Sequence, residues 1–303
     1  MFEAFLNSTI GMAAPILIAA LGEYLVEEAG MINIGIEGAM LCGAFFAFAA
    51  AYFSGSLALG LFAGIAAGCA INALFGILAI DLAVSQVVAG AAIDILALGI
   101  TGVFYRRMFG ITGSAIMVRP IPKIPLGPLA KIPLAGPLLF DRNALVYLTF
   151  ALVPILSYLA MRTRHGLRLR AAGERPEAAD ALGLNAYRLR WEAVLASGAL
   201  SGIAGAYLTL AYANTFVENI TAGRGFVALS VVIVGRWNPW GMAAAAILFG
   251  AAMALQFGLQ ALGAGLPYQF FLALPYALTL VVLAIVGGQA AAPSALGEPY
   301  RRA

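Results

Sequence analysis

Polar and ionisable side chains inside otherwise apolar segments are the residues of this sequence that could do chemistry. Glu37 follows Asn33 by four residues, which places both on one face of a helix. Further polar side chains of this kind are Gln86, Asp94, Asn214, Glu218, Gln256 and Gln260. A charge at membrane depth is costly and is therefore a functional candidate. Together these residues predict a passage for a polar solute, although each could instead satisfy backbone groups freed at a glycine kink.

The covalent chemistry that the sequence suggests is that of an intramembrane hydrolase, but the candidate nucleophile and the candidate base do not lie in the same apolar segment. Ser197 lies in an Ala-Ser-Gly run, but the single histidine, His165, falls in a polar loop beyond the preceding apolar segment. Two cysteines and one histidine do not supply a zinc site. The sequence also lacks the Gly-x-x-x-x-Gly-Lys-Ser/Thr loop that cradles ATP phosphates. We therefore expect no enzyme activity and no cofactor bound by this chain.

The composition is that of a membrane protein. The chain has 303 residues, of which 63% are hydrophobic and 10% are charged, and its mean hydropathy is +0.96. A soluble fold cannot bury so much apolar surface. The net charge of +3 gives no reason to expect a nucleic-acid partner. We expect an all-α polytopic membrane protein with a single transmembrane domain over residues 1–303.

Apolar runs of about 20 residues mark bilayer crossings, and the sequence contains about nine (8–10) such runs. They cover residues 6–26, 34–53, 57–79, 86–105, 143–161, 192–213, 225–236, 240–260 and 268–287. The seventh is short, so we expect a half-helix that the polar stretch 216–225 extends. Interruptions at 29–38 and 214–225 predict paired broken or re-entrant segments, as in transporters.

Two long loops lie between these runs. Residues 106–142 contain six prolines, which predicts an extended, irregular loop. Residues 162–190 contain seven arginines, and the positive-inside rule favours them on the cytoplasmic side by a small margin. One crossing, 143–161, separates the loops, so the proline-rich loop is expected outside. This arrangement predicts the N-terminus outside and the C-terminus inside.

The arginine-rich loop contains a charged segment that predicts a short helix standing in water. Its residues are Gly173, Glu174, Arg175, Pro176, Glu177, Ala178, Ala179, Asp180 and Gly183. Pro176 suits a first helical turn, which Arg175 or Glu174 would cap. Gly183 suits the left-handed residue that ends a helix. The alanines are small and leave room for another protein's cleft, so the segment predicts a rigid helix driven by a soluble partner.

Small residues recur at every fourth position in two apolar runs. One stripe consists of Gly60, Gly64, Gly68, Asn72 and Gly76, and the other of Ser197, Ser201, Gly205 and Thr209. Such stripes let helix backbones approach closely in lipid. They predict tight packing inside the bundle or, alternatively, a seam with a second membrane chain.

Three blocks of the sequence resemble one known family. The segment Glu28-Ala-Gly-Met-Ile-Asn-Ile-Gly-Ile-Glu-Gly-Ala-Met40 resembles a signature of permease subunits of bacterial ABC importers for simple sugars and nucleosides. Residues 169–185 resemble that family's coupling loop, and residues 195–207 follow in the same order. Position 29 is Ala, where the family commonly has a basic residue. Ribose and branched-chain amino acid permeases are related to this family.

The resemblance implies the shorter of two unlike permease subunits in the bacterial cytoplasmic (inner) membrane. Its partners would be the second permease, a cytoplasmic ABC ATPase that binds ATP and Mg²⁺, and an extracytoplasmic substrate-binding protein or lipoprotein. The charged helix would be the coupling helix, and a nucleoside or simple sugar would cross by alternating access. The alternative is a stand-alone secondary transporter or channel for a small polar solute, which would explain the polar residues but not the charged helix.

Overall fold

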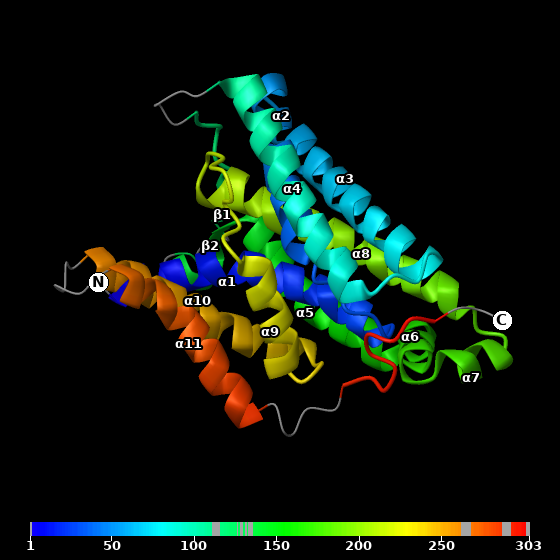
Figure 1. Ribbon diagram of the computed structural model, residues 1–303. Helices are drawn as coiled ribbons and strands as arrows, with labels where there is room; N and C mark the ends of the chain where they lie inside the picture. The colour runs from blue at the N-terminus through cyan, green and yellow to red at the C-terminus, as the bar shows by residue number, and fades with distance from the viewer. Residues whose placement is uncertain are drawn as a thin grey trace.

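The fold is a bundle of α-helices with one pair of short antiparallel strands (Figure 1). The computed structural model describes residues 2–110, 116–125, 127, 130, 132, 136–261, 268–286 and 292–300. The predicted all-α polytopic fold is confirmed.

The helices follow one another along the chain, and the long proline-rich loop separates α4 from α5. They are α1 (Phe2–Glu28), α2 (Ile36–Ser54), α3 (Leu57–Gly76), α4 (Gln86–Phe109), α5 (Ala144–Arg162), α6 (Arg164–Glu174), α7 (Pro176–Ala181), α8 (Ala186–Tyr207), α9 (Arg224–Val234), α10 (Pro239–Ala261) and α11 (Tyr268–Val286). The π-helical turns η1 (Ile77–Asp81) and η4 (Leu208–Tyr212) continue α3 and α8, and η3 (Gly136–Phe140) lies in the proline-rich loop. The strands are β1 (Lys123–Pro125) and β2 (Asp141–Asn143), with Lys123 opposite Asn143.

Each predicted span has a helix at its place in the structure. Seven of the described helices are long and apolar enough to cross a membrane. α9 has only 11 residues, so it is a half-helix, as the sequence predicts. The count of about nine crossings stays a prediction. The arginine-rich loop is itself mostly helical, because it contains α6 and α7 and the first residues of α8.

α1 connects the two ends of the molecule. Near its start, Arg142 of β2 donates a hydrogen bond from Nη2 to Asn7 Oδ1 at 2.6 Å. Just beyond its end, the backbone of Gly30 lies against Gly173 of α6. The proline-rich and arginine-rich loops therefore lie at opposite ends, as predicted (Figure 1). We call these the strand end and the α7 end.

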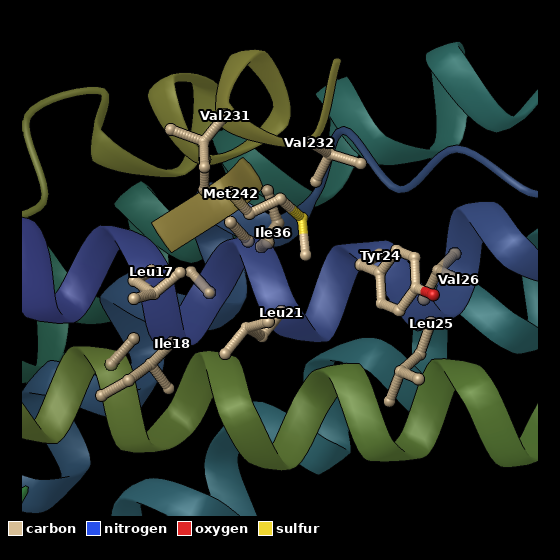
Figure 2. Close-up of a cluster of buried hydrophobic side chains, with 14 of the residues drawn as sticks. Leu17, Ile18, Leu21, Tyr24, Leu25, Val26, Ile36, Val231, Val232 and Met242 are labelled. Atoms are coloured by element: carbon tan, nitrogen blue, oxygen red, sulfur yellow. The ribbon is translucent and has the colours of Figure 1, made fainter. Parts of the chain in front are cut away.

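The core of the bundle surrounds α1, which packs against α8, α9 and α10. Figure 2 shows side chains of α1 close to those of α9 and α10, with Leu21, Tyr24 and Met242 among them. Nearly every residue of α1 from Met12 to Glu28 is buried. A helix that is apolar on all sides needs neighbours on all sides, and this explains why the first span is central.

The glycine stripe of α3 faces the backbones of α2 and α8. A Cβ added to Gly60 would lie 2.8 Å from the carbonyl oxygen of Ala47, and one on Gly68 would lie 2.7 Å from the Cα of Gly202. Real Cβ atoms do not approach backbone so closely, so these positions require glycine. Of the two alternatives that the stripe left open, packing within the bundle is confirmed for these residues.

Candidate functional site

Side chains from two helices hold the break between α1 and α2. Residues 29–35 are not helical. Glu23 Oε1 accepts a hydrogen bond from Asn33 N at 2.7 Å, and Gln86 Oε1 accepts one from Ile32 N at 2.7 Å. Backbone N–H groups that leave a helix inside an apolar bundle need such acceptors. The two side chains therefore fix the shape of the break.

Glu37 joins the start of α2 to the start of α9. Its side chain is buried, and Oε1 and Oε2 accept hydrogen bonds from Gly223 N at 2.7 Å and Gly225 N at 2.6 Å. The first N–H groups of a helix have no partner in the helix and carry partial positive charge, so they stabilise a carboxylate. A Cβ on Gly225 would lie 2.7 Å from the Cα of Glu37. Only glycine allows this approach.

Asp94 of α4 binds the start of α2 in the same way that Glu37 binds the start of α9. Its Oδ1 accepts a hydrogen bond from Gly38 N at 2.7 Å, in the first turn of α2. Asn33 donates from Nδ2 to Asn72 Oδ1 at 3.1 Å, which ties the break to the small-residue stripe of α3. The two interruptions that the sequence predicts thus meet inside the bundle, and each of the two helix starts there has an acidic partner.

Four of the eight predicted path residues therefore come together, namely Asn33, Glu37, Gln86 and Asp94. Glu37, Gln86 and Asp94 accept hydrogen bonds from backbone N–H groups. The alternative reading, in which these side chains satisfy freed backbone groups, is confirmed for these three. A direct role of the cluster in solute passage stays a prediction.

The other four predicted path residues lie apart from this cluster. Asn214 and Glu218 follow η4, and Thr215 between them bridges to Met117 of the proline-rich loop. Glu218 is exposed and pairs with Arg106 at 2.8 Å, and the hydrogen bond from Arg106 holds the pKa of Glu218 below its usual value. Gln256 is buried and Gln260 is half-buried, both on α10.

The predicted charged helix consists of two helices that meet at Arg175. Pro176 occupies the first position of α7, and Gly183 has a φ of +81° just after it, both as predicted. The predicted cap is wrong. Arg175 stands at the N-cap position without a capping hydrogen bond, because a guanidinium has no acceptor atom. Glu174 does not cap α7 either, since its Oε2 accepts hydrogen bonds from Ser294.

α7 presents one face to solvent and buries the other. Glu177 and Ala178 are exposed, whereas Ala179 is only 3% exposed and packs within this chain. The expectation that Ala179 leaves room for another protein is therefore wrong for this residue. Leu182, directly after α7, is 83% exposed, which is the largest value among the exposed large hydrophobic side chains described. Glu177, Ala178 and Leu182 are thus among the side chains that this end of the molecule offers to solvent.

Sequence reasoning missed two parts of this region. Glu23 lies within the predicted span 6–26, and its charge in an apolar run was the available signal. The C-terminal residues 292–300 contact α6 and α7 in the structure. Their sequence has no periodicity or motif that could have indicated this contact.

The helical bundle, the two meeting helix breaks and the polar helix pair at one end are the features of a membrane transport subunit. Residues 5–283 match the family described as branched-chain amino acid transport system permease components, and the chain belongs to this family. It is therefore a multi-pass permease subunit of an ABC transporter and not itself an enzyme.

Relatives of similar length carry more specific names. The guanosine ABC transporter permease protein NupQ of Bacillus subtilis is 35% identical over 97% of this chain and 95% of its own length. The nucleoside ABC transporter permease protein NupC of Lactococcus lactis is 35% identical over 95% of this chain and 93% of its own length. The putative glucose ABC transporter permease protein TsgC13 of Haloferax volcanii is 35% identical over 98% of this chain and 97% of its own length. No solved structure matches the chain.

Proposed function

We propose that this chain is the permease subunit of an ABC importer that moves a nucleoside across the bacterial cytoplasmic membrane. The observation that carries the proposal is the near full-length similarity to permeases named for guanosine and for nucleosides. A simple sugar is the second candidate substrate, because TsgC13 is similar to the same extent. The ATP and Mg²⁺ that drive transport belong to a partner ATPase on the cytoplasmic side, at the α7 end.

The partners in this proposal include a second, unlike permease and an extracytoplasmic binding protein or lipoprotein. A shorter similarity supports the unlike pair. The nucleoside ABC transporter permease protein NupB of Lactococcus lactis is 30% identical over 106 residues, which cover 35% of this chain. The chain thus resembles two differently named nucleoside permeases of one organism, and NupC far more completely than NupB.

In this proposal α7 is the coupling helix and Leu182 is its apolar anchor. The exposed face of α7 with Glu177 and Ala178 would enter a groove of the ATPase, whose closure displaces α6 and α7. The cluster around Asn33 and Glu37 would line or shape the solute path and change with that displacement. Asn214, Glu218, Gln256 and Gln260 remain path candidates, supported by their polarity alone.

Replacing Leu182 with alanine is expected to weaken binding of the ATPase about tenfold to a hundredfold. The reason is that burial of a leucine side chain is worth about 1.5–3 kcal/mol, and every 1.4 kcal/mol corresponds to about tenfold in affinity. Titration of the purified ATPase against the permease pair in lipid nanodiscs measures this affinity. Leu167→Ala, at an exposed leucine of α6, is the matched control. Equal affinities for the two variants and the unaltered chain would exclude Leu182 as an anchor.

The substrate is tested by uptake into vesicles that contain the complete transporter. Labelled guanosine is the probe, and unlabelled adenosine, ribose, glucose and leucine are the competitors. We expect ATP-dependent guanosine uptake that adenosine reduces and that glucose and leucine leave unchanged. Glucose uptake without guanosine uptake would favour the sugar reading. Guanosine uptake without ATP or the ATPase would favour a stand-alone transporter.

A further inference from the structure

The C-terminal segment 292–300 lies against two separate parts of the molecule at the α7 end (Figure 1). Ala295 N donates a hydrogen bond to the carbonyl oxygen of Gly173 at 3.0 Å, and Gly297 N donates one to that of Gly30 at 3.2 Å. The first carbonyl belongs to the last turn of α6, and the second belongs to the break between α1 and α2. The segment therefore holds both at once.

Ser294 and Tyr300 of the same segment reach the last residue of α6 and the end of α7. Ser294 donates from N and from Oγ to Glu174 Oε2, at 3.3 and 2.6 Å. Tyr300 donates from its hydroxyl to Asp180 Oδ2 at 2.6 Å. Asp180 Oδ1 also accepts a hydrogen bond from Ala186 N at 3.0 Å, at the start of α8. One carboxylate thus links α7, α8 and the C-terminal segment.

Arg190 of α8 binds both the C-terminal segment and the break between α1 and α2. Its side chain is 2% exposed and is among the largest that are fully buried. Nε donates to the carbonyl oxygen of Ala29 at 3.2 Å, and Nη1 donates to that of Glu298 at 3.4 Å. The guanidinium also lies 5.6 Å from the centroid of the Tyr300 ring, within the range of a cation–π interaction. A buried cation needs such partners, so the segment and the break are both part of the environment that keeps Arg190 inside.

A series of contacts leads from α6 through the break to the start of α9. The backbones of Gly173 and Gly30 touch, because a Cβ on Gly30 would lie 3.0 Å from the Cα of Gly173. The break then runs to Asn33, which Glu23 holds, and to Glu37, which binds the start of α9. A displacement of α6 and α7 therefore meets an uninterrupted series of packed groups that leads to α9.

We infer that residues 292–300, together with Arg190, hold α6 and α7 against the break between α1 and α2. Because of these contacts, a displacement of α6 and α7 by the ATPase also moves the break. The inference rests on the proposed function, because it takes α7 as the part that the ATPase moves. Without the segment, α7 keeps its exposed face and Leu182, but its displacement is passed on less completely to the break. Loss of the segment should therefore leave ATPase binding unchanged but raise the amount of ATP hydrolysed for each solute molecule transported.

The test uses the complete transporter in lipid vesicles with two variants of this chain. One variant ends at residue 291, and the other carries Ser294→Ala with Tyr300→Phe, which removes only side-chain hydrogen bonds. ATPase binding, ATP hydrolysis and guanosine uptake are measured on the same vesicles. For the truncated chain we expect unchanged binding and a roughly fivefold rise in ATP hydrolysed per guanosine imported, at the lower end of usual coupling effects. The double variant should show a smaller rise.

The matched control is Ser157→Ala with Tyr158→Phe, which makes the same two changes on α5, where Ser157 bonds only within its own helix and neither side chain makes a hydrogen bond to residues 292–300 in the described structure. It should leave the ratio of ATP to guanosine unchanged. An unchanged ratio in both tail variants, with weaker ATPase binding in Leu182→Ala, would overturn this inference and leave the proposed function intact. Loss of ATPase binding on truncation would also overturn it, because the segment would then belong to the docking surface. Unchanged binding in Leu182→Ala would count against the docking role of α7 itself.

Discussion

Replacing Glu37 with alanine is expected to lower both the stability of the permease and its transport rate. The N–H groups of Gly223 and Gly225 would lose their acceptor inside the bundle, at a cost of about 1–3 kcal/mol for each group. The start of α9 would then detach more readily from α2. We expect uptake to fall roughly tenfold, the factor that corresponds to about 1.4 kcal/mol in favour of the detached conformer. Thermal unfolding in detergent and uptake in vesicles measure the two effects.

Two further substitutions make this test specific. Glu192→Ala removes a half-exposed carboxylate of α8 that pairs with Arg188 at 2.9 Å, and such pairs contribute only about 0–1 kcal/mol. Glu37→Gln keeps one acceptor oxygen but places an amide N–H₂ against a backbone donor, so its effect should be intermediate. A Glu37→Ala protein with the unfolding temperature and uptake of Glu192→Ala would show that this carboxylate does not hold α9.

Gly205→Ala is expected to destabilise the bundle by about 1–3 kcal/mol, the usual cost of overpacking. A Cβ at this position of α8 would overlap the carbonyl oxygen of Met40 and would lie 2.6 Å from Ala44 N. Both atoms belong to the backbone of α2, so no rotation of a side chain can relieve the contact. Thermal unfolding and the fraction of monodisperse protein on size-exclusion chromatography measure the loss.

Gly99→Ala is the control for this substitution. Gly99 lies in α4, and a Cβ there would meet no heavy atom within 4 Å. Alanine is also the better helix former in an exposed position, so this variant should unfold at or above the temperature of the unaltered chain. Equal unfolding temperatures for the two variants would contradict the close contact between α2 and α8.

Local pattern was sufficient to predict most helices. Apolar runs gave each span its place, and the length of the seventh run was enough to predict that α9 is a half-helix. Proline and glycine signals placed the start and the end of α7 correctly. Its cap was predicted wrongly because the true partner of Glu174 is Ser294, 120 residues away in the sequence. No local pattern carries information about a contact of that separation.

The sequence predicted some members of the candidate cluster but not Glu23, and it did not predict the geometry of the cluster. The sequence indicated that Asn33, Glu37 and Asp94 are exceptional, because polar groups inside apolar runs are costly. It could not indicate that Glu37 binds Gly223 and that Asp94 binds Gly38, since both pairings depend on how the helices pack. Ala179 shows the same limit, because its small size suits a partner's groove and an internal contact equally well.

The bond between Glu37 and Gly223 also constrains how the protein is made. The two residues are 186 positions apart in the chain, so α2 enters the membrane long before its partner is synthesised. During that interval the newly inserted acid has none of its native donors, and a carboxylate in hydrocarbon is unfavourable. α9 is too short to cross a bilayer alone, since a crossing needs about 20 residues. The stable insertion of α9 should therefore depend on Glu37, an acidic group that enters the membrane much earlier in synthesis.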